Sequence, residues 1–131
     1  MEDKTVVITG ATSGLGRATA LQLAQKGASV VIIARNNTKA NEVITEIKRE
    51  GGNGQVVISD LSSMKDTKEA ADSITKVVDR LDVLINNAGA HFPKYRETPE
   101  GFESTLALNY LSPFLLTHHL IEPMKQTASD Y

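Results

Sequence analysis

The chain has 131 residues, no cysteine, a formal net charge of −2 and 40% hydrophobic residues. This length predicts one domain, and the lack of cysteine excludes disulfide bonds, thiolate metal sites and cysteine nucleophiles. The slightly negative charge argues against a nucleic acid or an anionic membrane surface as the partner. The longest apolar run, residues 30–34, is too short to span a bilayer, and no signal peptide precedes the first expected strand. We therefore expect a soluble cytoplasmic protein with no membrane partner.

The first expected elements are a strand at residues 4–8 and a helix at residues 15–26, joined by a glycine-rich turn. The turn contains the three glycines Gly10, Gly14 and Gly16. A strand that ends in a tight turn before a helix directs backbone N–H groups and the positive end of the helix dipole to one point, which suits a pyrophosphate. The hydroxyls of Thr12 and Ser13 can bond phosphate oxygens, although such residues also cap helices without any ligand.

Strands and helices are expected to alternate along the rest of the chain. They are a strand at residues 29–33, a helix at 38–50, a strand at 55–59, a helix from 63 to about 80, a strand at 82–86 and a helix to about 124. The last helix is expected to open with Thr98 as its N-cap, Pro99 at its first position and Glu100 at the positive end of its dipole. This alternation predicts the α/β class, as one Rossmann-like dinucleotide-binding domain with a doubly wound parallel sheet.

Three motifs follow one another on these elements: Thr9-Gly10-x-x-x-Gly14-x-Gly16, Asp60-Leu61 and Asn86-Asn87-Ala88-Gly89. With these motifs, the whole chain resembles the short-chain dehydrogenase/reductase family. Residues 98–103 and 108–117 resemble the retinol-dehydrogenase-like branch of that family in particular. The resemblance implies an NAD(P)-dependent oxidoreductase that transfers hydride between a nicotinamide and the alcohol or carbonyl carbon of a small-molecule substrate.

The resemblance also implies a role for each motif. The glycine turn, which includes Leu15, should hold the pyrophosphate of the cofactor. Asp60 and Leu61 should flank the adenine ring, with the Asp60 carboxylate accepting a hydrogen bond from the exocyclic amine. The residues that should line the nicotinamide ribose are Asn87, Ala88 and Gly89. As an alternative, Asp60 could be a turn or capping residue, but the carboxyl end of a parallel strand is where ligands bind in open α/β sheets.

The end of the second expected strand bears on the choice between NAD and NADP. An acidic residue there would bond the ribose 2′-hydroxyl of NAD and repel a 2′-phosphate, but no acid occurs between Ala34 and Glu42. Arg35 instead offers a planar guanidinium that can bind a phosphate with two hydrogen bonds, unless it is simply a solvated arginine at a strand end. The sequence therefore favours NADP over NAD.

Asn109 and Pro113 form a pair in the last expected helix. Proline has no N–H to donate to the carbonyl four residues earlier, which here belongs to Asn109. In the family that the chain resembles, the asparagine at this position uses its main-chain carbonyl to hold a water in the proton relay to the catalytic lysine. The resemblance thus implies a catalytic role for Asn109, and the alternative is a proline-kinked helix without such a role.

The tyrosine acid/base of the family has no counterpart in this sequence. That chemistry needs a tyrosine with a lysine four residues later, to lower the pKa of the phenol. Four residues after Tyr95 is Pro99, and four residues after Tyr110 is Phe114. Tyr131 is the last residue of the sequence given. Nor do we expect a metal site, because His118 and His119 are neighbours on a helix and point about 100° apart.

Residues 126–131 form a polar segment where the family would begin its fifth strand. We therefore expect the cofactor-binding half of a longer enzyme, truncated after the fourth strand and its following helix and inactive when isolated. The fourth strand would then be an exposed apolar edge. The alternative is a stand-alone, non-catalytic nucleotide-binding or interaction module that associates through that strand and the last helix as a homo-oligomer.

Overall fold

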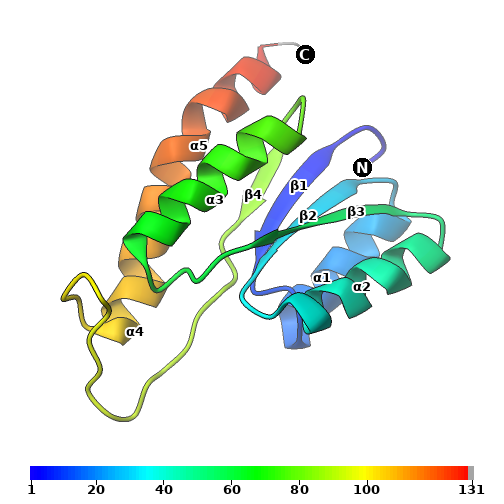
Figure 1. The fold of residues 1–131 in the computed structure, drawn as a ribbon. Helices are drawn as coiled ribbons and strands as arrows, with labels where there is room; N and C mark the ends of the chain where they lie inside the picture. Colours follow the sequence, from blue (N-terminus) through cyan, green and yellow to red (C-terminus); the bar gives the residue numbers. More distant parts are fainter. Residues whose placement is uncertain (130–131) are drawn as a thin grey trace.

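The computed structural model describes residues 1–129. Its strands form a four-stranded parallel sheet in the order β3-β2-β1-β4 (Figure 1). The strands are β1 Thr5–Thr9, β2 Ser29–Ala34, β3 Asn53–Ile58 and β4 Val83–Ile85. The helices are α1 Gly14–Gln25, α2 Asn37–Arg49, α3 Met64–Val77, α4 Ser104–Leu106 and α5 Ser112–Ala128, with a π-helical turn, η1, at Ala107–Leu111. The predicted Rossmann-like, doubly wound arrangement is confirmed.

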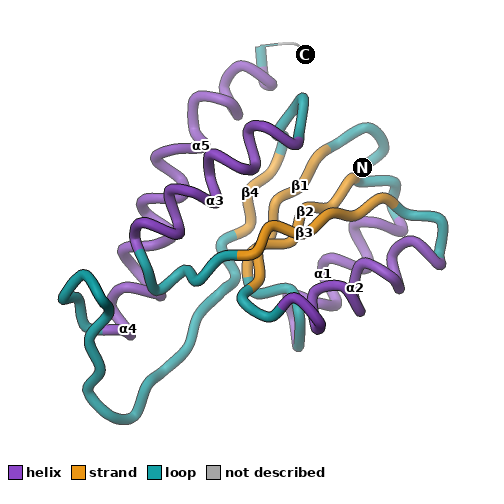
Figure 2. The backbone as a smooth tube through the Cα atoms, in the orientation of Figure 1, coloured by secondary structure: helices purple, strands orange, loops and turns teal. Residues whose placement is uncertain are grey.

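The helices cover both faces of the sheet. Figure 2 shows α1 and α2 on one side of the strands and α3 and α5 on the other. Successive β1 side chains point to opposite faces, so Val6 and Ile8 join the core under α1 and α2, whereas Val7 joins the core under α3 and α5. A strand buried on both faces needs apolar residues at every position, which explains the unbroken apolar runs of β1 and β2.

The parallel register brings the carboxyl ends of all four strands to one edge of the sheet. Thr9 pairs with Ile33, and Ile33 pairs with Val57 on the next strand. On the other side of β1, Ile8 pairs with Ile85 of β4. The chain crosses to opposite sides of β1 after β1 and after β3, and such a reversal opens a crevice at the carboxyl edge of the sheet.

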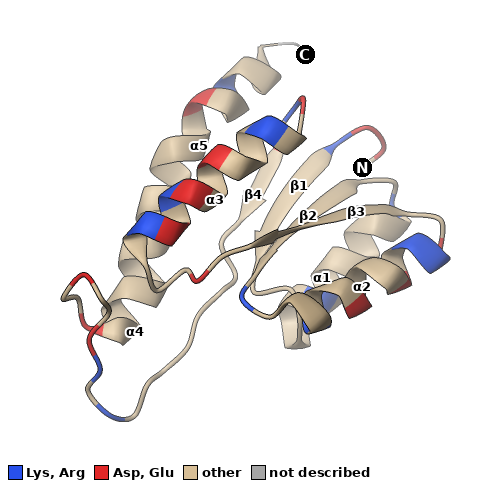
Figure 3. Cartoon of the chain, viewed as in Figure 1, with Lys and Arg blue, Asp and Glu red and all other residues tan. Residues whose placement is uncertain are grey.

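The outward surface of α3 is polar. Figure 3 shows positions of Lys or Arg interspersed with positions of Asp or Glu along this helix. Its buried residues lie at helical spacing and are Thr67, Ala70, Ala71 and Ile74. No helix in the described part of the chain combines the length and apolar character that a membrane crossing requires.

The predicted opening of the last helix at Thr98 is wrong. Residues 98–101 form a turn in which the Gly101 N–H donates to the Thr98 carbonyl at 2.9 Å, and the helix begins only at Ser104. Proline at the second position and glycine at the fourth favour such a turn, and Gly101 has φ +86°, which a helix cannot continue. Glu103 caps the helix instead, because its carboxylate accepts a hydrogen bond from the Thr105 N–H at 2.6 Å.

The helix that follows contains a π-helical turn rather than a simple kink. In η1 the Ser112 N–H donates to the carbonyl of Ala107, five residues earlier. Pro113 lies two residues after the end of this turn and cannot donate the bond that a regular helix would place on Asn109, so the backbone widens there. Beyond Pro113 the helix tolerates a second proline, Pro123, and ends at Ala128 rather than near residue 124.

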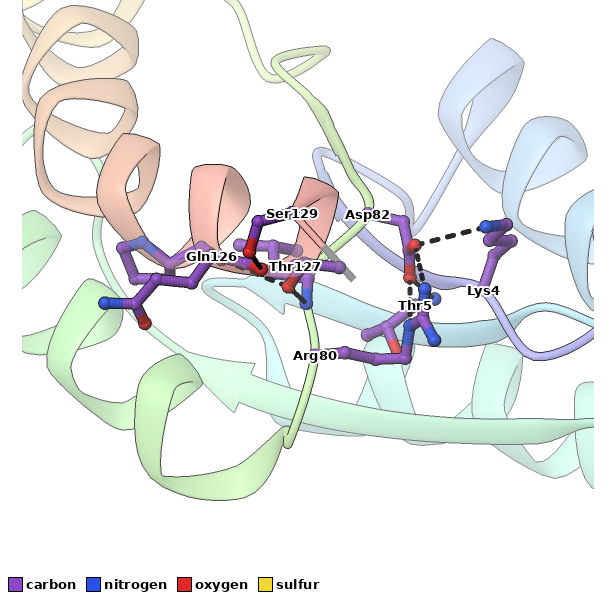
Figure 4. Close-up of polar contacts among 9 residues, drawn as sticks. Lys4, Thr5, Arg80, Asp82, Gln126, Thr127 and Ser129 are labelled. Atoms are coloured by element: carbon purple, nitrogen blue, oxygen red, sulfur yellow. Dashed lines mark hydrogen bonds and ion pairs between the residues drawn. The ribbon is translucent and has the colours of Figure 1, made fainter. Parts of the chain in front are cut away.

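A buried carboxylate joins the amino ends of β1 and β4, at the edge opposite the crevice. Figure 4 shows Asp82 between Lys4, Thr5 and Arg80. The Asp82 side chain is only 4% exposed, accepts from the Thr5 N–H at 2.8 Å, and pairs with the Arg80 guanidinium at 2.7 and 2.9 Å. Next to it, the Leu81 N–H donates to the Thr127 hydroxyl of α5 at 2.9 Å. These contacts fix the short strand β4, which is two residues shorter than predicted.

Candidate functional site

An open cavity of about 550 Å³ lies at the carboxyl edge of the sheet. Its walls come from the turn after β1, the end of β2 and the segments that follow β3 and β4. The predicted site residues that line it are Gly10, Thr12, Ser13, Leu15, Gly16, Arg35, Asp60, Leu61, Asn87, Ala88 and Gly89. Gly14 and Asn109 do not line the cavity. The structure thus brings the three motifs of the sequence and Arg35 to one place.

The glycine turn approaches the segment after β4 so closely that side chains are excluded. A Cβ at Gly10 would lie 2.7 Å from the Ala88 Cα, and a Cβ at Gly16 would collide with the Asn87 side chain and with the Gly10 carbonyl. Gly10 also has φ +67°. Gly14 is different, because a Cβ there would meet nothing within 4 Å, and only its φ of +56° favours glycine.

The amino end of α1 faces the cavity without a side-chain cap. Ser13 occupies the N-cap position, but its hydroxyl makes no capping hydrogen bond, so the alternative of Ser13 as a simple cap is wrong. Leu15, in the first turn of α1, is 78% exposed and lines the cavity. An uncapped helix start with free N–H groups and a positive dipole end is suited to an anion.

Hydrogen bonds fasten the glycine turn to the segment after β4. The buried Thr9 hydroxyl accepts from the Asn87 N–H at 3.0 Å and from the Ala88 N–H at 2.8 Å. In return, the Asn87 side-chain amide donates to the Gly10 carbonyl at 3.0 Å. Sequence reasoning quoted Thr9 in a motif but assigned it no role, since a threonine hydroxyl aimed at a chain segment 78 residues away leaves no local signal.

Asn109 clamps the same segment with its side chain. Its Oδ1 accepts from the Ala90 N–H at 3.1 Å, and its Nδ2 donates to the carbonyls of Ala90 at 2.6 Å and Thr105 at 2.8 Å. A Cβ at Gly89 would lie 2.7 Å from the Asn109 Oδ1, so the clamp also requires that glycine. The role predicted from the family concerned the main-chain carbonyl of Asn109, and it stays a prediction.

Asp60 is a turn residue that keeps one oxygen available. Its Oδ1 accepts from the Ser62 N–H at 3.0 Å and from the Ser62 hydroxyl at 2.7 Å, which is the pattern of an Asx turn. Its Oδ2 has no hydrogen-bond partner within residues 1–129. Leu61 is 8% exposed and packs into the core under α3, so that its edge forms part of the cavity wall. Both interpretations of Asp60 are therefore compatible with its geometry.

A second cation, Lys39, lines the same cavity as Arg35. Arg35 directly follows β2, and Lys39 lies in the first turn of α2. The backbone there is fixed by Asn36, whose Oδ1 accepts from the Lys39 N–H at 3.0 Å. Neither cation forms an ion pair within the described part of the chain. Sequence reasoning missed Lys39, although its place four residues after Arg35, at a helix start, was a signal.

The tyrosines in the described residues are unsuited to acid/base chemistry. The Tyr95 hydroxyl donates to the Glu97 carboxylate at 2.6 Å, and this hydrogen bond raises the pKa of Tyr95, whereas a general acid/base near neutral pH needs a lowered one. Neither Tyr95 nor Tyr110 lines the cavity. Tyr131 lies outside the described residues. Within residues 1–129, no three His, Cys, Asp or Glu side chains are grouped as a metal site would require.

Comparison with known proteins assigns the fold and motifs to a family. The family model described as short chain dehydrogenase matches residues 4–130. The chain belongs to this family. Retinol dehydrogenase 12 of Bos taurus is 42% identical to it over 127 residues, which are 95% of this chain and 40% of that protein. The likeness to the retinol-dehydrogenase-like branch is thereby confirmed, and the chain spans about 40% of the length of such relatives.

Solved structures of the family superpose on the chain. One is a metagenomic short-chain oxidoreductase in complex with NADP, with a TM-score of 0.84 and 31% identity, covering 95% of this chain and 57% of that one. Another is 3-ketoacyl-(acyl-carrier-protein) reductase from Brucella melitensis complexed with NADH, with a TM-score of 0.82 and 32% identity, covering 98% and 53%. The two neighbours carry different dinucleotides in the same fold.

Proposed function

We propose that this chain forms the cofactor-binding part of an NADP-dependent short-chain oxidoreductase. A bound nicotinamide would supply the hydride that such an enzyme exchanges with the alcohol or carbonyl carbon of a small molecule. The proposal rests above all on the cavity at the carboxyl edge of the sheet, where the glycine turn, Asp60 and the segment after β4 converge. The close approach at Gly10 and Gly16 supports the proposal, because the absence of side chains there lets the glycine turn pack against the segment after β4 and form the cavity with it.

Each wall of the cavity suits one part of a dinucleotide. The uncapped amino end of α1 would bind the pyrophosphate, because helix N–H groups and the helix dipole favour an anion. The free Oδ2 of Asp60 would accept from the adenine amine, and Leu61 would pack against the adenine ring. Asn87, Ala88 and Gly89, which Thr9 and Asn109 hold in place, would line the nicotinamide ribose.

Charge at the end of β2 supports NADP as the preferred cofactor. Arg35 and Lys39 line the cavity there without ion-pair partners in the part of the chain that the structure describes, and no acidic residue occurs before Glu42. A 2′-phosphate would gain charge-assisted hydrogen bonds from both cations, whereas the ribose 2′-hydroxyl of NADH would gain neither of these charge pairings.

Fluorescence titration of the chain with NADPH and with NADH tests this proposal. We expect NADPH to bind at least about tenfold more tightly, because a hydrogen bond to a charged group contributes about 1.5–3 kcal/mol and 1.4 kcal/mol corresponds to tenfold. Equal affinities would contradict the NADP preference. Binding of neither cofactor at millimolar concentration would contradict the cofactor-binding function itself.

A second candidate function is a stand-alone binding module without catalysis, which is favoured by exposed apolar side chains before and in the last helix. Tyr95 and Tyr110 lie outside the cavity, and the sequence contains no Tyr-x-x-x-Lys pair. The edge of β4 and the exposed side chains of Leu106, Tyr110 and Phe114 would then serve association with a second copy. A stable oligomer that binds NADPH would support this function over the first.

A further inference from the structure

The carboxylate of Glu100 caps a helix that is distant in sequence. Glu100 lies in the turn at residues 98–101, within the segment that links β4 to α4. Its Oε1 accepts from the Met64 N–H at 2.7 Å, and its Oε2 accepts from the Lys65 N–H at 2.9 Å. Met64 and Lys65 are the first two residues of α3, 36 and 35 positions earlier in the chain. Both oxygens of this carboxylate are therefore committed to one helix end.

This cap completes the amino end of α3. The first N–H groups of a helix have no partners inside the helix, and a negative charge next to them is favoured by the helix dipole. Glu100 satisfies the first two, and the Ser63 hydroxyl accepts from the third, the Asp66 N–H, at 3.1 Å. The acid at a positive dipole end that the sequence predicts is present, but it serves α3 rather than the helix that follows it.

Glu100 also joins two parts of the chain that each lead to a wall of the cavity. Residues 59–62 form one wall and lead directly into the end of α3 that Glu100 caps. The opposite wall comes from residues 87–90 and Phe92, at the start of the segment whose far end carries Glu100. Asn109 holds this segment at Ala90, and Glu100 holds it at the turn. Glu100 itself does not line the cavity.

We propose that Glu100 is a positioning residue that sets the separation of these two walls. A dinucleotide must contact both walls at once, with its adenine at residues 59–62 and its nicotinamide end at residues 87–92. A ligand that carries only the adenine half contacts one wall and tolerates a change in their separation. This inference rests on the proposed cofactor-binding function.

The test compares a whole cofactor with its adenine half. Calorimetric titrations with NADPH and with adenosine 2′,5′-bisphosphate are made on the unsubstituted chain and on Glu100→Gln and Glu100→Ala. Glu97→Gln is the matched control, because Glu97 lies on the same segment and its carboxylate accepts only from Tyr95 within the described residues. We expect both Glu100 variants to lose at least about fivefold in NADPH affinity, the low end of couplings between sites, and to bind the half-ligand within about twofold of the unsubstituted chain.

Hydrogen exchange supplies a readout that does not depend on the cofactor. The Met64 and Lys65 amides should lose protection in Glu100→Ala and keep it in Glu97→Gln. Equal losses for NADPH and for the half-ligand, or NADPH binding as tight as in the Glu97 control, would overturn the positioning role. If the unsubstituted chain binds neither NADPH nor NADH, the proposed function fails and this inference fails with it. That holds even if hydrogen exchange shows that Glu100 caps α3.

Discussion

At the scale of single residues, the cavity depends on an absent side chain at Gly16. The two atoms that a Cβ there would strike, in the Asn87 side chain and the Gly10 carbonyl, are hydrogen-bonded to each other. One added methyl group would therefore separate the turn from the segment after β4. The same contact closes the cavity wall, so packing and ligand binding are linked at this position.

Gly16→Ala is expected to destabilise the fold by about 1–3 kcal/mol, as overpacking does, and to weaken NADPH binding as well. Urea unfolding and fluorescence titration measure the two effects. Gly51→Ala is the control, because Gly51 has φ +84° and open space around it, so alanine strains the backbone by about 1–2 kcal/mol away from the cavity. An unchanged NADPH affinity in Gly16→Ala would contradict the proposed role of the glycine turn in binding the cofactor.

Arg35→Gln and Lys39→Gln are each expected to reduce NADPH affinity by about tenfold or more and to leave NADH affinity within about twofold. The reason is that each glutamine removes a cation from the wall that would face the 2′-phosphate. Lys48→Gln, in the last turn of the same helix, controls for the loss of one positive charge. Titrations of each variant with NADPH and with NADH should therefore show a reduced preference for NADPH in Arg35→Gln and Lys39→Gln only. An equal drop in affinity for NADPH and NADH would contradict the role of these cations.

Residues that act within their own turn could be predicted from the sequence, and residues that act across the fold could not. The spacing of Gly10, Gly14 and Gly16 predicted a tight turn because backbone sterics are local. Asn109 was singled out through Pro113, yet its side-chain clamp on Ala90 spans 19 residues and was missed. Glu100 was assigned to the nearest helix, because sequence alone does not show which helix end a carboxylate reaches.

At the scale of elements, β4 is short and depends on contacts beyond its own ladder. Only Val83, Leu84 and Ile85 pair with β1. Asp82, directly before them, joins β1 through the Thr5 N–H and two nearby cations. Because the Asp82 side chain is almost fully buried, this carboxylate stabilises the strand at the point where the ladder begins.

Asp82→Asn is expected to lower the free energy of unfolding by about 2–3 kcal/mol, since a buried carboxylate that accepts charge-assisted hydrogen bonds is replaced by a neutral amide. Urea denaturation measures the loss. Glu122→Gln, which removes an exposed ion pair with Lys125 on α5, should cost less than about 1 kcal/mol. Equal costs in the two variants would show that Asp82 does not stabilise β4.

Element types were predictable here, and element ends were less so. A sheet that is covered on both faces requires apolar runs in its strands and apolar residues at helical spacing in its helices. Both patterns can be read directly from the sequence. The predicted start of the last helix was wrong, because Thr98 and Pro99 favour a helix start but Thr98, Pro99 and Gly101 together favour a β-turn as strongly. The π-helical turn before Pro113 was missed, since a proline within a helix can kink it or widen it.

At the scale of the whole molecule, the chain contains a cofactor cavity but no suitable proton donor within the residues described. It spans about 40% of relatives such as retinol dehydrogenase 12 of Bos taurus. Tyr95 has a raised pKa, and Tyr110 is 63% exposed and away from the cavity. Binding and turnover should therefore separate in this chain.

We expect the isolated chain to show no turnover with NADP⁺ and a primary alcohol, because neither tyrosine within residues 1–129 lines the cavity, where it could take the hydroxyl proton. Absorbance of NADPH at 340 nm is the assay, and a catalytically competent full-length relative is the positive control. Light scattering on the same sample gives the mass. Measurable NADPH production would contradict the expectation, and a stable oligomer that binds NADPH would favour the module without catalysis.

The central position of β1 affects the chain while it is being synthesised. Val6 of β1 pairs on one side with Val30 and on the other with Val83. At a translation rate of about 5–20 residues per second, the second partner leaves the ribosome about 3–10 s after the first. During that interval one apolar edge of β1 is open to other nascent chains, so the earliest strand made is also the last to be fully enclosed.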